Sequence, residues 1–187
     1  MIVTGANSKR QPEIATFTET FADGVVNTPL SSRLQMGDSK DRLSLAYNSF
    51  FADIWVNGPD SKGVLIHVVT TGRGNPAEDA RLNLQLVLRA GEVLETGTGQ
   101  RFVLGPEELE LEAAALGGLI RHHGWELQLA ADARLSWPFY PYNPYADAPE
   151  TELEQAVGRL TIPLRFTTGR YIRPDEQEIN LRIAVPE

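Results

Sequence analysis

Residues 80–90 read ARLNLQLVLRA, and every second position from Leu82 to Leu88 is a leucine. Asn83 and Gln85 lie between these leucines. Successive side chains of a β-strand point to opposite faces, so this period of two predicts a strand with one buried face. Leucine by itself favours helices, but an alternation kept over seven residues outweighs that propensity. We therefore predict a β-strand here.

The same period recurs along the chain. It predicts four further strands, at residues 42–47 (RLSLAY), 125–130 (WELQLA), 159–166 (RLTIPLRF) and 179–185 (INLRIAV). A more continuous apolar run, GVLIHVVTT at residues 63–71, fits a central strand. Composition predicts further strands at residues 14–21, 49–56 and 101–105.

Turn-forming residues separate these segments at short intervals, as in NGP at residues 57–59 and GTG at residues 97–99. Many short strands joined by such turns are typical of antiparallel sandwiches and barrels. We predict an all-β, mainly antiparallel fold, namely a two-sheet β-sandwich of jelly-roll type. The alternative is a closed, lipocalin-like β-barrel.

At most one or two short helices are expected. Residues 106–118 (PEELELEAAALGG) contain good helix formers but also alternate, and we favour a strand that ends in a hairpin turn at Gly117-Gly118. In residues 151–157 (TELEQAV), Thr151 and Glu154 match a capping box. This second segment predicts one or two turns of helix.

Length and composition indicate one globular domain. The chain has 187 residues, of which 42% are hydrophobic and 22% are charged. These proportions are those of an ordinary globular protein, and the length suits one domain better than two. We predict a single β-rich domain over residues 1–187, with an irregular loop rich in aromatic residues and proline at residues 137–150.

Charge and cysteine content argue against several classes of function. The formal net charge of -8 repels nucleic acid and anionic lipid, so neither a nucleic-acid partner nor a membrane partner is expected. The absence of cysteine excludes disulfides and thiolate metal sites. No run approaches the roughly 20 apolar residues that cross a bilayer, and no signal-like stretch opens the sequence, so we expect a cytoplasmic protein. The usual nucleotide and hydrolase motifs are missing, and no cofactor is expected.

Residues 137–145 read WPFYPYNPY and contain five aromatic residues and three prolines. Proline holds the preceding residue in extended conformations, so the segment predicts a stiff ribbon that displays its rings at low entropic cost. Rings beside polar side chains suit a sugar, which stacks on aromatic faces and hydrogen-bonds through its hydroxyls. The predicted ligand-binding residues are Trp137, Phe139, Tyr140, Tyr142, Asn143, Tyr145 and Asp147.

Two other interpretations of these rings stay open. They could close the core at the end of a sandwich, because each buried aromatic removes roughly 150–250 Å² from water. They could instead be buried between copies of a homo-oligomer. The sequence alone does not choose among these interpretations.

His122 and His123 are adjacent, and neighbouring strand residues point to opposite faces. The pair is therefore not expected to bind one metal ion, and no metal site is predicted. A histidine that faces the aromatic loop could transfer protons at neutral pH. The candidate catalytic residues are His122, His123, Tyr140 and Asp147.

A cluster of acidic residues at positions 147–154 precedes Arg159 and Arg165. We interpret these charges as cross-strand pairs or a solvated surface, with a charged-ligand site as the alternative.

The sequence thus favours a non-catalytic binding or accessory domain, whose ligand is a carbohydrate or another small polar molecule at residues 137–147. An enzyme acting on a sugar-like substrate, as a lyase or hydrolase, and a structural subunit of a homo-oligomer are the alternatives.

Overall fold

The computed structural model describes residues 2–3, 15–37, 41–60, 63–73, 78–140, 152–165 and 175–183. Its contacts divide the chain into two compact units. Unit 1 comprises Met1–Thr16, Leu84–Ile162 and Ala184–Glu187, and unit 2 comprises Phe17–Asn83 and Pro163–Ile183. The single domain stays a prediction, and each unit is described by itself below.

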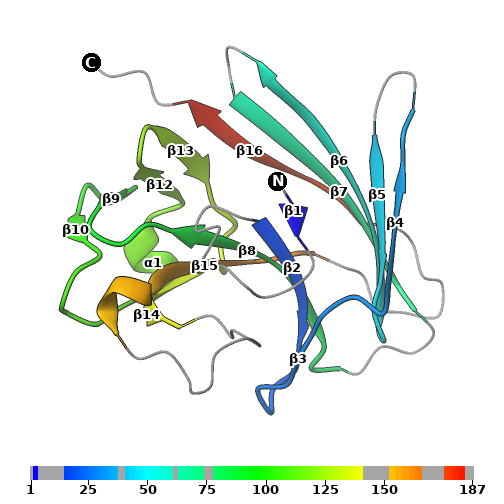
Figure 1. The fold of residues 1–187 in the computed structure, drawn as a ribbon, viewed down its shortest axis with the longest axis horizontal. Helices are drawn as coiled ribbons and strands as arrows, with labels where there is room; N and C mark the ends of the chain where they lie inside the picture. Colours follow the sequence, from blue (N-terminus) through cyan, green and yellow to red (C-terminus); the bar gives the residue numbers. More distant parts are fainter. Residues whose placement is uncertain are drawn as a thin grey trace. The chain divides into compact units, whose positions relative to one another are not determined.

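Unit 2 is built on five antiparallel strands in the spatial order β4-β5-β6-β7-β16 (Figure 1). Their bounds are β4 (Ser31–Gln35), β5 (Arg42–Ala46), β6 (Phe50–Asp60), β7 (Gly63–Gly72) and β16 (Asp175–Ile183). The unit also contains most of β2 (Ala15–Thr20), which pairs with the short strand β3 (Val26–Asn27). Burial along β7 alternates over most of the strand, because one face of the sheet covers the core.

The core of unit 2 is mainly apolar, and Glu19 is the buried side chain among its described residues that can carry a charge. Its largest fully buried side chains are Phe17, Leu45, Tyr47, Phe50, Ile54 and Leu82. The buried side chain of Glu19 accepts hydrogen bonds from Ser49 N at 2.7 Å and from Asn27 Nδ2 at 2.9 Å. A buried polar group is tolerated only when it is hydrogen-bonded, so Glu19 is a structural anchor of this unit.

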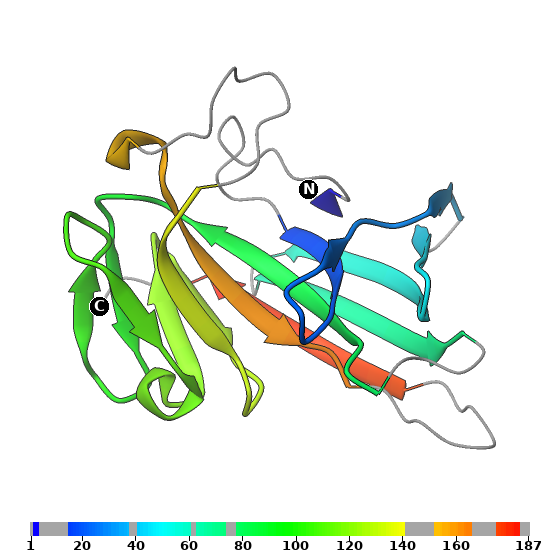
Figure 2. The same cartoon turned by 90° about the horizontal axis from the view of Figure 1, so that it is seen from below.

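Unit 1 contains two sets of strands. One set runs in the order β8-β15-β14-β11 and the other in the order β10-β9-β12-β13. The first set consists of β8 (Arg81–Leu88, from Leu84 onward in this unit), β15 (Val157–Pro163), β14 (Arg134–Phe139) and β11 (Leu109–Leu111). The second consists of β9 (Val93–Thr96), β10 (Arg101–Val103), β12 (Leu119–His122) and β13 (Trp125–Gln128). β14 and β15 lie side by side in Figure 2, and β1 (Ile2–Val3) pairs in parallel with the first residues of β2.

Packing between the strands of unit 1 is close. Leu94, Leu104, Ile120, Leu127, Leu135 and Leu160 are among its buried side chains. At Gly158 on β15 an added Cβ would lie 2.8 Å from Leu104 Cδ1 and 3.1 Å from Leu88 Cβ. The leucines therefore fill the space that a side chain at Gly158 would occupy.

The predicted all-β class is confirmed. The described strands form several mainly antiparallel sheets, none of which closes into a barrel, as in a sandwich-like fold. The lipocalin-like alternative is not seen in the described residues, and the jelly-roll connection stays a prediction. The helical content is also as expected: α1 (Ala113–Leu116) is one turn, and η1 (Leu153–Gln155) is a single 3-10 turn. Among the described residues, no helix is long and apolar enough to cross a membrane.

Three local predictions need correction. Residues 106–118 form β11 and then the helix α1, which ends at Gly117 with φ 64° instead of a hairpin. β8 is buried on both faces, since Asn83 and Val87 are only 4% and 8% exposed. The irregular loop does not begin at Trp137, because β14 continues to Phe139.

Candidate ligand-binding site

Trp137 is a core residue of unit 1. Its side chain is 2% exposed, and its indole Nε1 donates a hydrogen bond to the carbonyl oxygen of Gly105 at 2.7 Å. The peptide bond between Trp137 and Pro138 is cis. A buried ring that is held in this way cannot stack on a ligand arriving from solvent, so the position favours core packing for Trp137.

Phe139 points to the opposite face from Trp137, although both have odd numbers in one strand. Ser136 lies opposite Arg159 on β15, but Phe139 lies opposite Val157, so β14 contains one extra residue between these pairs. Such an irregularity changes the face to which the following side chain points. Phe139 therefore shares a face with Arg159, and both side chains are partly exposed.

The guanidinium carbon of Arg159 lies 4.1 Å from the centroid of the Phe139 ring. This is a cation–π contact, in which the ring supports one face of the guanidinium. Tyr140, which follows Phe139, is also partly exposed. The other predicted ligand-contacting residues, Tyr142, Asn143, Tyr145 and Asp147, lie outside the described residues.

A row of polar side chains crosses the sheet at Arg159. Arg159 lies opposite Ser136, and Ser136 lies opposite Glu110 on β11. Directly opposed residues of antiparallel strands share a face, so the three side chains point the same way. Arg134 precedes Ser136 by two positions and joins this face, which we call the arginine face: Glu110, Arg134, Ser136, Phe139 and Arg159.

Arg159 lacks a counterion among the described residues. Its Nε atom is buried and has no hydrogen-bond partner, and no ion pair of the described residues includes it. Burial lowers the pKa of Arg159, the charge of Arg134 lowers it further, and Glu110 acts in the opposite direction. Within the described part of the chain Arg159 therefore forms no cross-strand ion pair, and the acidic residues at positions 147–151 lie outside that part.

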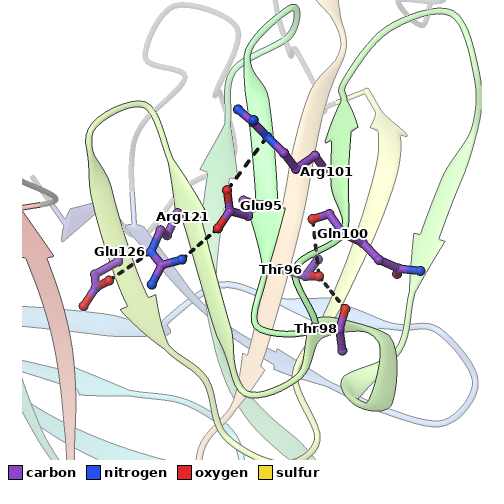
Figure 3. Close-up of polar contacts among 7 residues, drawn as sticks. All are labelled: Glu95, Thr96, Thr98, Gln100, Arg101, Arg121 and Glu126. Atoms are coloured by element: carbon purple, nitrogen blue, oxygen red, sulfur yellow. Dashed lines mark hydrogen bonds and ion pairs between the residues drawn. The ribbon is translucent and has the colours of Figure 1, made fainter. Parts of the chain in front are cut away.

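By contrast, two arginines of the second strand set are paired with carboxylates (Figure 3). Arg121 Nη1 lies 2.7 Å from Glu95 Oε1, and its Nε lies 3.2 Å from Glu126 Oε2. Arg101 Nε lies 3.8 Å from the other oxygen of Glu95. Hydrogen bonds to Glu95 and Glu126 raise the pKa of Arg121. Each arginine of this network has a carboxylate partner, whereas the structure as described gives Arg159 none.

His122 is buried and has a structural role in unit 1. Its Nε2 accepts a hydrogen bond from the backbone N–H of Arg89 at 3.1 Å, so this nitrogen carries no proton. Nδ1 is then left to donate to the carbonyl oxygen of Val93 at 3.2 Å. Both ring nitrogens are used within unit 1.

His123 forms the turn between β12 and β13. It has φ 44° and is followed by Gly124 with φ 80°, while His122 and Trp125 pair on either side. Two consecutive positive φ values are typical of a type I′ hairpin. The exposed ring of His123 lies 3.5 Å from Glu92 Oε1 and 3.4 Å from a guanidinium nitrogen of Arg89. The two histidines thus separate into one core residue and one turn residue.

A shallow hollow of about 350 Å³ lies along residues 101–109. Phe102, Val103, Pro106 and Leu109 provide its apolar lining, and Arg101, Glu107 and Glu108 provide charges. Both charge signs are present there, and none of the predicted site residues lines the hollow. We therefore place the candidate site on the arginine face.

No group of three or more histidine, aspartate or glutamate side chains in the described part of the chain could hold a metal ion. Fold and site together define an all-β protein with an arginine-bearing candidate ligand site. Searches against protein-family models, curated proteins and solved structures find no match for this chain.

Proposed function

We propose that this protein is a non-catalytic ligand-binding or accessory domain. Its ligand, a carbohydrate or another small polar molecule, contacts the arginine face and Tyr140, with residues 142–147 as predicted contributors. The observation that supports the proposal is the guanidinium of Arg159, which is stacked on Phe139 and has a buried donor without an acceptor. A jelly-roll fold and a cytoplasmic location belong to the same proposal.

Binding is favoured over catalysis by the use of the histidines. Both ring nitrogens of His122 form hydrogen bonds with backbone groups, and His123 occupies a hairpin turn. A histidine that acts as a general acid or base needs a ring nitrogen free to reach the substrate. The sugar-acting enzyme therefore has less support than the binding domain.

The first prediction concerns Phe139. We expect Phe139→Ala to weaken oligosaccharide binding about tenfold or more, because the guanidinium loses the ring that orients it, a contact of about 1–2 kcal/mol. Hits from a glycan array, followed by titration calorimetry, measure the effect. The control is Phe51→Ala in unit 2, where Arg73 lies 5.4 Å from the centroid of the Phe51 ring. Equal losses in the two variants, or none in either, would count against the arginine face as the site.

A subunit of a homo-oligomer is the second candidate function. The edge strand β4 favours it, because all five of its residues are exposed and β5 is its one neighbour among the described strands. Leu34 on β4 is 61% exposed, and Met36 just after the strand is 70% exposed. Exposed edge strands pair readily with other strands. A second copy fits, since antiparallel pairing centred on Leu34 puts Arg33 opposite a glutamine, Gln35, and opposes no like charges.

We expect Leu34→Lys to shift any dimer to monomer, because two lysines would then meet at the centre of the paired strands. Size-exclusion chromatography with light scattering over a range of concentrations measures the mass. The control is Val56→Lys, since Val56 is 42% exposed but lies in β6, which is paired on both sides. A mass that is the same in wild type and Leu34→Lys at every concentration argues against β4 as the interface.

A further inference from the structure

The arginine face has a donor that the folded chain leaves unsatisfied. Nε of Arg159 is buried and lacks a partner among the described residues, while the side chain as a whole keeps some exposure. A buried N–H without an acceptor costs free energy, and a charged donor costs more than a neutral one. Because Nε itself is buried, a ligand that approaches from solvent meets the rest of this partly exposed side chain, whose charge no described carboxylate pairs.

The contact with Phe139 determines how such an acceptor can approach. The guanidinium carbon lies 4.1 Å from the centroid of the aromatic ring. The N–H groups of a guanidinium lie in its plane, and its two terminal nitrogens can donate two parallel hydrogen bonds without using the buried Nε. A planar oxyanion with two oxygens matches this edge.

The charges around Arg159 favour an anion over a neutral sugar. Arg134 lies on the same face, and its charge adds to that of Arg159. Glu110 is separated from Arg159 by Ser136 on the intervening strand, and neither arginine is in an ion pair with it. The five residues of the arginine face thus include two arginines and one carboxylate, Glu110, in a chain whose net charge is -8. This local excess of positive charge is the opposite of the overall balance.

We infer that the ligand of the arginine face carries a carboxylate, as an acidic sugar does, and that Arg159 binds this group through its guanidinium edge. Arg134 adds attraction at longer range. This inference rests on the proposed function, because it names the chemical class of the ligand of the same site.

The test compares a galacturonate oligomer, which carries carboxylates, with its fully methyl-esterified form, which has the same sugar backbone but is neutral. Titration calorimetry at low salt is expected to show that the acid form binds at least tenfold more tightly to the full chain. Arg159→Gln should remove this preference, and Arg159→Lys should recover only part of it, because an ammonium cannot make the bidentate contact. Arg33→Gln, which removes one exposed charge in unit 2, should keep the preference.

Folding is controlled with Arg159→Met, which keeps an unbranched apolar side chain of about the length of the arginine stem and removes the charge. Replacing an uncompensated buried cation by an apolar side chain is often neutral or stabilising, so its melting temperature should be no lower than that of the wild type. Acid-form binding that survives in Arg159→Met would overturn the inference.

The remaining outcomes separate the two proposals. Equal binding of the acid and the ester overturns the carboxylate assignment but leaves a binding domain. Stronger competition by inorganic phosphate than by acetate also overturns it, in favour of a phosphate group. If neither oligomer binds and neither anion protects the protein against thermal unfolding, both the inference and the proposed function are wrong for this face.

Discussion

Trp137→Ala is expected to lower the free energy of unfolding by about 3–5 kcal/mol, the usual cost of truncating a large buried aromatic residue. The ring is 2% exposed, and its Nε1 donates to the carbonyl oxygen of Gly105 at 2.7 Å. The substitution would leave a cavity in unit 1 and an unsatisfied carbonyl group. Urea denaturation, followed by far-ultraviolet circular dichroism, measures the change.

Two further variants serve as comparisons for the loss of stability in Trp137→Ala. Trp137→Phe keeps most of the apolar contact but removes the donor, so a smaller loss of about 1–2 kcal/mol is expected. Phe139→Ala lies two residues away on the other face and should cost much less than Trp137→Ala. A Trp137→Ala protein as stable as the wild type would mean that the ring is not part of the core.

Gly97→Ala is expected to destabilise unit 1 by about 3 kcal/mol, because overpacking against backbone cannot be relieved by a rotamer change. A Cβ at this position would lie 2.3 Å from the carbonyl oxygen of Gly117 and 2.9 Å from its carbon. Gly97 also donates its N–H toward the carbonyl oxygens of Leu116 and Leu119 at 2.9 and 2.7 Å. The backbone is therefore held in place where the methyl group would enter. The midpoint of urea unfolding measures this effect.

Gly105→Ala is the matched control for Gly97→Ala. The nearest atom to a Cβ at Gly105 is the carbonyl oxygen of Val103 at 3.8 Å, an ordinary contact. We expect its stability to stay within about 0.5 kcal/mol of the wild type. If both alanine variants lose the same amount, the close approach of Gly97 to Gly117 is not the cause.

Much of the strand pattern could be predicted because it is local. The alternation around Leu84 and the apolar run around Val68 give β8 and β7 directly. β14 was harder to predict, since Pro138 and its neighbouring rings are typical of a loop, and its irregular pairing with β15 has no sequence signal. β9 and β12 are short, four residues each, and too short for a periodic pattern to identify.

The candidate site was predicted only in part. Phe139 and Tyr140 are partly exposed, as ligand contact requires, whereas the ring of Trp137 is buried. The charges around Arg159 predict cross-strand pairs or a solvated surface, because acidic and basic residues close together in a sequence usually have one of these roles. A buried donor without an acceptor becomes visible only when every neighbouring side chain has a position. Glu19 was missed for the same reason, since its partner Ser49 is 30 residues away.

The sequence by itself determined the all-β class, because the side-chain period of a strand is a property of each short segment. The tertiary structure alone decided which aromatic residue enters the core and which arginine has no ion-pair partner among the described residues. Both outcomes depend on the pairing of β14 with β15, where one extra residue turns Phe139 toward Arg159 and leaves Trp137 inside. Pairing between distant strands is fixed by packing across the whole sheet, and no local pattern encodes it.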